Sequence, residues 1–92
     1  MAAKTVLVRY FGRVQGVGFR ATTRSLAQEF KLKGWVKNEA GGSVQLIVTA
    51  EPVEIEAFLK AVRGSRLGVY IDREEQESSV NVGELKGFDI QY

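Results

Sequence analysis

The residues with the clearest chemical potential lie in one short stretch, Gly12–Arg20, which has the sequence Gly-Arg-Val-Gln-Gly-Val-Gly-Phe-Arg. Its first seven residues include three glycines, which allow positive φ and let a ligand approach the backbone closely. Arg20 adds a planar guanidinium that can bind two oxygens of one anion. Converging backbone N–H groups beside such a cation form a site for phosphate or carboxylate. The alternative is a tight structural connection that is followed by a solvated arginine.

The flanking sequence predicts that this stretch connects a strand to a helix. Residues 4–11 alternate in the manner of a strand, whereas residues 21–31 have apolar side chains at helical spacing. A helix start offers unpaired N–H donors and a partial positive charge, which favour an anion. Arg20 lies at the end of the helix dipole that is unfavourable for a cation, which also indicates an anionic partner.

Composition excludes several kinds of chemistry. The chain has 92 residues and contains neither cysteine nor histidine, so it lacks a thiol nucleophile, the most common general base and the most common metal ligand. No Gly-Lys-Ser/Thr follows the glycines, and no acidic residue is spaced for a dinucleotide ribose. The net charge is only +2 and the charges alternate in sign, which disfavours a broad nucleic-acid surface.

The length suits one domain that covers residues 1–92, and the sequence has no repeat or linker. No apolar run approaches the roughly 18 residues of a membrane-spanning helix, and the N-terminus lacks a signal-peptide apolar region. We therefore expect a cytoplasmic monomer that does not bind membranes.

The periodicity predicts an α+β fold, a ferredoxin-like two-layer sandwich in which two helices cover one face of an antiparallel sheet. Gly34 is expected to end the first helix, and residues 74–79 to form a charged, exposed turn. The expected strands are residues 4–11, 35–38, 43–50, 67–74 and 88–91, and the expected helices are residues 21–31 and 51–64.

Asn38 is the second candidate for chemistry. Asparagine is uncommon in strands, yet it lies at the end of the strand 35–38, on the same face as Val36. Its amide can donate and accept hydrogen bonds at once, so it suits a site that holds a water molecule beside a substrate oxygen. The alternative is a residue that only begins the turn Ala40–Gly42.

Three segments together resemble the acylphosphatase family: Gly12–Arg20, the sequence Gly-Trp-Val-Lys-Asn at Gly34–Asn38, and Gly42–Val44. The resemblance extends over essentially the whole chain. It implies a ferredoxin-like fold and an enzyme that hydrolyses acyl phosphates to a carboxylate and inorganic phosphate, without metal or cofactor. Inorganic phosphate or sulfate would then occupy the same site.

The resemblance also implies roles for individual residues. The arginine of the family motif falls on Arg20 and its asparagine on Asn38, so these are the expected catalytic residues. Asn38 would orient the attacking water, while Arg20 and the loop amides would bind phosphate. The expected phosphate-binding residues are Gln15, Gly16, Val17, Gly18, Phe19 and Arg20.

The chain departs from the family pattern at two loops. Ala40–Gly42 stands where many members have Pro-Asp-Gly, and Gly64–Arg66 stands where many have Gly-Pro. We expect neither segment to touch the site. Glu39 replaces a small or neutral residue, and strand alternation predicts that it points to the face opposite Asn38.

Two other functions fit the expected fold. A ferredoxin-like RNA-binding domain would stack bases on aromatic side chains of the uncovered sheet face, but on the strands 4–11 and 43–50 that face is expected to carry only one aromatic side chain, Phe11. A non-catalytic module of this family would bind phosphate or carbamoyl phosphate within a larger system. The presence of both Arg20 and Asn38 favours the enzyme.

Overall fold

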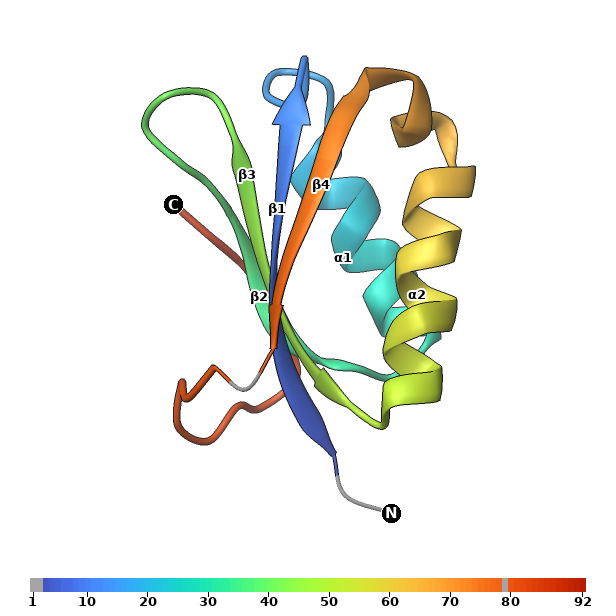
Figure 1. The fold of residues 1–92 in the computed structure, drawn as a ribbon, viewed down its shortest axis with the longest axis vertical. Coiled ribbons are helices and arrows are strands. Elements are labelled where there is room, and N and C mark those ends of the chain that lie inside the picture. The colour runs from blue at the N-terminus through green and yellow to red at the C-terminus, as the bar shows by residue number, and fades with distance from the viewer. Residues whose placement is uncertain (1–2, 79) are drawn as a thin grey trace.

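The computed structural model describes residues 3–78 and 80–92. Within these residues, one sheet has the strand order β4-β1-β3-β2-β5, and two helices cover one of its faces (Figure 1). The strands are β1 (Lys4–Gly12), β2 (Lys33–Asn38), β3 (Val44–Ala50), β4 (Ile71–Ser78) and β5 (Phe88–Gln91). The helices are α1 (Phe19–Glu29), α2 (Pro52–Gly64) and the short 3-10 helix η1 (Arg66–Tyr70).

This arrangement confirms the predicted ferredoxin-like sandwich and adds one difference. Strands β4, β1, β3 and β2 pair antiparallel, as expected. Strand β5 instead pairs in parallel with β2, so the sheet is mixed. The long connection after β4 crosses to the opposite edge of the sheet and therefore allows β5 to run in either direction.

The core lies between the helices and the sheet. The predicted helical stripe of α2 is buried, with Phe58 and Val62 fully so. Phe58 packs edge-on between Phe30 and Phe88, at ring-centroid distances of 5.8 Å and 6.3 Å. Each large apolar side chain buried in this way contributes roughly 1.5–3 kcal/mol to folding. This packing fixes the helices on the sheet and with them the position where α1 begins.

Helix α1 begins and ends earlier than predicted. It starts at Phe19, which places Arg20 in the first turn, and Gly34 does not end it. Lys31 adopts the left-handed conformation instead, with φ of 56°. The N–H of Leu32 donates to the carbonyl of Ala27 at 3.0 Å, and this bond closes the helix without a glycine.

Gly34 has a different function, because it lies inside β2. Its φ is +154°, and a Cβ at this position would lie 1.9 Å from the carbonyl oxygen of Ile47 on β3. Only glycine permits this close approach of the two strands.

The predicted fourth strand is present but begins later than expected, and the turn predicted after it was wrong. Residues 66–70 form η1, and β4 occupies Ile71–Ser78, so the expected strand 67–74 is confirmed only from residue 71, and residues 75–78 continue the strand instead of forming a turn; Ser79 lies outside the described residues. Strand β4 is an edge strand whose side chains are largely exposed, so it needs no apolar alternation. Charged side chains on such an edge also oppose pairing with another chain.

Two glycine substitutions test these assignments. Gly34→Ala should lower the free energy of unfolding by about 2 kcal/mol or more, because Cβ would meet the backbone of β3. Gly64→Ala, at the end of α2 where Cβ meets nothing within 4 Å, should raise it by about 0.5 kcal/mol. Urea unfolding followed by circular dichroism measures both. Equal midpoints for the two variants would contradict the close approach at Gly34.

Candidate active site

The loop between β1 and α1 has the backbone that the glycine spacing predicted. Gly16 and Gly18 adopt φ of 79° and 76°. Gly18 is the N-cap of α1, where no side chain caps the helix and the first turn has no acidic residue. The first N–H groups of α1 are therefore not neutralised by a local carboxylate or hydroxyl, and an anion is the ligand that complements them.

Buried side chains attach this loop to the core. Val14 is fully buried, and the ring of Phe19 packs on the ring of Tyr10 with centroids 5.1 Å apart. The N–H of Arg13 donates to the carbonyl of Tyr70 at 3.0 Å, while the Arg13 side chain is exposed. The loop thus has a buried anchor on each side of its glycines.

Gln15 makes a long-range contact that the sequence did not reveal. Its Nε2 donates to the carbonyl of Glu39 at 2.8 Å and to that of Ser43 at 2.9 Å. The side chain therefore ties the loop to the turn between β2 and β3, directly after Asn38. Sequence reasoning considered only the backbone amide of Gln15, and a single glutamine in a loop carries no signal for such a contact.

Arg20 lies in the first turn of α1 and is half-buried. Its Nη1 is 3.4 Å from the carbonyl oxygen of Gln91, to which it donates, and its guanidinium carbon lies 4.8 Å from the centroid of the Tyr92 ring. It belongs to none of the ion pairs seen between described residues. Its positive charge is thus available to a bound anion.

Asn38 is the last residue of β2 and is half-buried. The carboxylate of Glu39 accepts from Arg9 Nε at 3.1 Å and from Ser43 Oγ at 3.0 Å. Arg9 lies on the uncovered face of the sheet, so Glu39 points away from the helix-covered face, as predicted. The carboxylate is neutralised there.

The contacts bring the predicted residues to one end of the sheet. Gln91, which accepts from Arg20, pairs with Lys37, the residue before Asn38. Gln15 reaches the residue after Asn38. The β1–α1 loop and the β2–β3 turn lie at the same end of the fold (Figure 1).

The expectation that the departing segments do not touch this site was wrong for Gly64–Arg66. Nη2 of Arg66 donates to the carbonyl of Val17 at 2.8 Å and to Thr22 Oγ1 at 3.0 Å. Gln15 contacts both residues that flank the turn 40–42. Arg66 therefore contacts the loop directly, whereas the turn 40–42 is connected to it through the residues on either side of the turn.

Tyr10 is the titratable group with a clearly altered protonation equilibrium. Burial, together with the nearby Glu74 carboxylate, raises the pKa of the Tyr10 phenol far above its ordinary value. The phenol stays protonated at neutral pH and is no candidate base.

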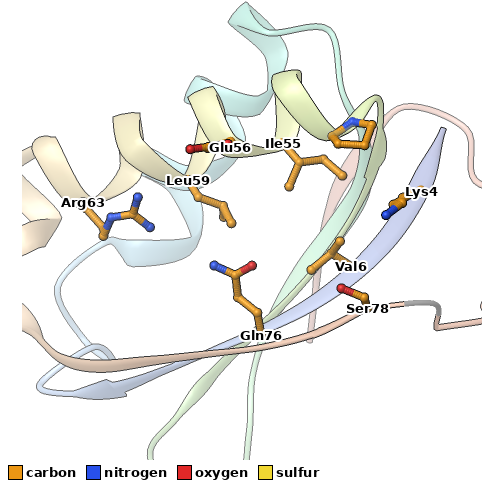
Figure 2. A pocket seen from close by; sticks show the side chains of 9 residues that line it. Lys4, Val6, Ile55, Glu56, Leu59, Arg63, Gln76 and Ser78 are labelled. Carbon is orange, nitrogen blue, oxygen red and sulfur yellow. The ribbon is translucent and has the colours of Figure 1, made fainter. Parts of the chain in front are cut away.

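A cavity of about 340 Å³ lies elsewhere, between α2 and the strands β1 and β4 (Figure 2). It contains none of the predicted site residues. Its lining residues are Lys4, Val6, Pro52, Ile55, Glu56, Leu59, Arg63, Gln76 and Ser78. In the described part of the chain, no three His, Cys, Asp or Glu side chains gather where they could hold a metal, and no helix is long and apolar enough to cross a membrane.

Comparison with known proteins gives a consistent result. Residues 6–90 match the acylphosphatase family. An acylphosphatase from Listeria monocytogenes is 39% identical over 93 aligned positions that cover both chains completely. The crystal structure of acylphosphatase from Bacillus subtilis superposes with a TM-score of 0.88 at 29% identity, over 97% of this chain and 99% of that one.

A part of a larger protein is also similar. Full-length HypF, crystallised in its phosphate- and nucleotide-bound form, matches 98% of this chain with a TM-score of 0.88 and 34% identity, but the match covers only 12% of HypF. The free-standing relatives, in contrast, are matched over nearly their whole length. The chain belongs to the acylphosphatase family and hydrolyses acyl phosphates to a carboxylate and inorganic phosphate.

Proposed function

We propose that the backbone amides of residues 15–19 and the guanidinium of Arg20 bind the phosphoryl group of the substrate, and that Asn38 orients the attacking water. The observation that carries this proposal is the uncapped N-terminus of α1, where Gly18 is left-handed and Arg20 follows in the first turn.

The chemistry requires positioning more than acid–base catalysis. An acyl phosphate is a mixed anhydride, and its carboxylate is a good leaving group. The water oxygen forms a bond to phosphorus, the bond from phosphorus to the acyl oxygen breaks, and the electron pair leaves with the carboxylate. The phosphoryl group itself accepts the proton of the water. Amides and a guanidinium stabilise the charge on the phosphoryl oxygens.

Asn38 provides the second requirement, a directed nucleophile. Its side-chain amide has no hydrogen-bond partner among the described residues, so both its carbonyl and its NH₂ group are available to water and substrate. Gln15 holds the adjacent residue 39 against the loop, which supports a fixed distance between water and phosphate.

The proposal also includes three expectations from the sequence. Residues 1–92 form one domain, the protein is a monomer in the cytoplasm, and the site binds neither metal nor nucleic acid. The charged edge strand β4 supports the monomer, because it opposes pairing between sheets. Size-exclusion chromatography with light scattering should give the mass of one chain. The mass of two chains would refute the monomer.

The first prediction for the site concerns its ligand and its independence of metal ions. Turnover of benzoyl phosphate should be unchanged by excess EDTA, because the proposed site uses only amides and a guanidinium. Phosphate at tens of millimolar should raise the Tm at matched ionic strength, since it binds only the folded protein. Activity that EDTA removes and Mg²⁺ or Zn²⁺ restores would refute the metal-free site.

The second prediction separates the roles of Arg20 and Asn38. Arg20→Ala should weaken phosphate binding and also lower kcat, and Arg20→Lys should rescue little because a point charge lacks the planar fork. Asn38→Ala should lower kcat by roughly 10²–10³ while the phosphate Kd stays nearly constant. Steady-state kinetics and isothermal titration with phosphate measure both.

Matched controls for these variants are Arg24→Ala and Asn81→Ala, since both side chains are exposed and lie outside the proposed site. They should retain wild-type kinetics, and circular dichroism should show that every variant is folded. Wild-type kcat in a folded Asn38→Ala protein would mean that Asn38 only begins the turn.

The third prediction concerns pH. Between about pH 5 and 8 kcat should be nearly constant, because the chain has no histidine and the raised pKa of Tyr10 keeps that phenol protonated throughout. Profiles with two substrates whose phosphoryl groups titrate differently would identify any contribution from the substrate. A bell-shaped profile common to both substrates would require a protein base and contradict the mechanism.

A further inference from the structure

The orientation of the loop amides depends on the carbonyls of the same peptide groups. In a trans peptide, the carbonyl of one residue and the N–H of the next point in opposite directions. The direction of the Gly18 N–H is therefore set by the Val17 carbonyl, and that of the Phe19 N–H by the Gly18 carbonyl. A contact that holds these two carbonyls on one side directs the two N–H groups to the other.

Arg66 makes this contact from outside the loop. Its Nη2 donates to the Val17 carbonyl at 2.8 Å and to Thr22 Oγ1 at 3.0 Å, and it lies 3.5 Å from the Gly18 carbonyl. The Gly18 carbonyl also accepts from the N–H of Thr22 at 3.0 Å. One guanidinium nitrogen thus joins the last two loop residues to the first turn of α1.

The segment that carries Arg66 is itself held in place. Leu67 is fully buried, and its N–H donates to Ser65 Oγ at 3.2 Å. A Cβ at Gly68 would lie 2.2 Å from the carbonyl oxygen of Arg63, so η1 packs directly against the end of α2. At the other end of η1, the Tyr70 carbonyl binds the N–H of Arg13, so this short helix holds both ends of the loop.

Gly18 is adapted to the same contact. A Cβ on Gly18 would lie 2.7 Å from Nη2 of Arg66, and its φ of +76° is unfavourable for other residues. The absence of a side chain at residue 18 therefore leaves room for the guanidinium of Arg66 and also allows the backbone to adopt a positive φ.

We propose that Arg66 is a positioning residue of the phosphate site: it binds the Val17 carbonyl and lies against the Gly18 carbonyl, so that the N–H groups of Gly18 and Phe19 face the phosphoryl group. It does not touch the substrate. The proposal rests on the proposed phosphate-binding role of the loop. It assigns a function to a residue in one of the two loops where the chain departs from the family pattern.

Arg66→Ala tests this role, because the side chain is exposed and its loss leaves the core intact. We expect the Kd for inorganic phosphate and the KM for benzoyl phosphate to rise roughly tenfold, with a smaller fall in kcat. In ¹⁵N-labelled protein, phosphate should shift the amide resonances of Gly18 and Phe19 less than in wild type. Arg66→Lys should restore part of the affinity, since an ammonium can still bind one of the acceptors.

Two controls test whether Arg66 acts by holding the loop carbonyls or only through its positive charge. Arg24→Ala removes an equally exposed positive charge from α1 and should leave the Kd unchanged. The ratio of Kd between Arg66→Ala and wild type should persist in 0.5 M NaCl (roughly, a Debye length near 4 Å), which screens long-range charge effects. An equal loss in Arg24→Ala, or a ratio that disappears in salt, would overturn the proposal.

Two further outcomes distinguish this proposal from the one on which it rests. Wild-type phosphate affinity in folded Arg66→Ala, with normal shifts of the loop amides, would overturn the positioning role alone. A wild-type protein whose loop amides do not respond to phosphate would instead refute the phosphate-binding role of the loop, and the positioning role with it.

Discussion

The proposed phosphate site imposes one constraint at the start of α1: several backbone N–H groups have to stay free for the ligand, while the carbonyls of the same peptide groups are bound within the protein. An uncapped helix start with Gly18 in the left-handed conformation meets the first requirement. Arg66 on η1 contributes to the second, because it donates to the Val17 carbonyl, and the Tyr70 carbonyl holds the other end of the loop by accepting from the N–H of Arg13. The sheet and the two large helices hold these parts at fixed distances, and such preorganisation is what a site without an acid–base side chain needs.

Much of the fold was predictable because its central elements obey a local period. The apolar stripe of α2 and the alternation of β1 follow from one-sided burial. Edge strand β4 has no such period. Most of its side chains are exposed, and on the side toward the helices it carries the polar residues Glu74, which binds Arg63 of α2, and Gln76, which lines the cavity beside α2. The end of α1 was missed for another reason: hydrogen bonds donated by the N–H groups of Lys31 and Leu32 close the helix in place of the expected glycine. Parallel pairing of β5 depends on a crossover that no local pattern encodes.

The candidate site likewise has a part that was predictable from the sequence and a part that was not. The glycine spacing and Arg20 predicted an anion-binding loop at a helix start, since both properties are local to the backbone. The side-chain contacts of Gln15 and Arg66 were not predictable, because each is a single polar residue that meets its partners through the tertiary fold. Both lie where long-range contacts stabilise a loop, and neither has a periodic or compositional signature.

Strand β5 shows why these long-range contacts matter for the proposed chemistry. It pairs with β2 through Lys37 and Gln91, and the Gln91 carbonyl accepts from Arg20. The residue proposed to bind phosphate and the strand that carries Asn38 are therefore joined through one short segment. Gln15 joins the loop to the other side of Asn38. A movement of Arg20 relative to Asn38 would have to disturb both connections. The two proposed catalytic residues are therefore held at a fixed relative position, although they are 18 positions apart in sequence. Since in-line attack tolerates little misalignment, this linkage would supply the orientation on which the proposed mechanism relies in place of a histidine base.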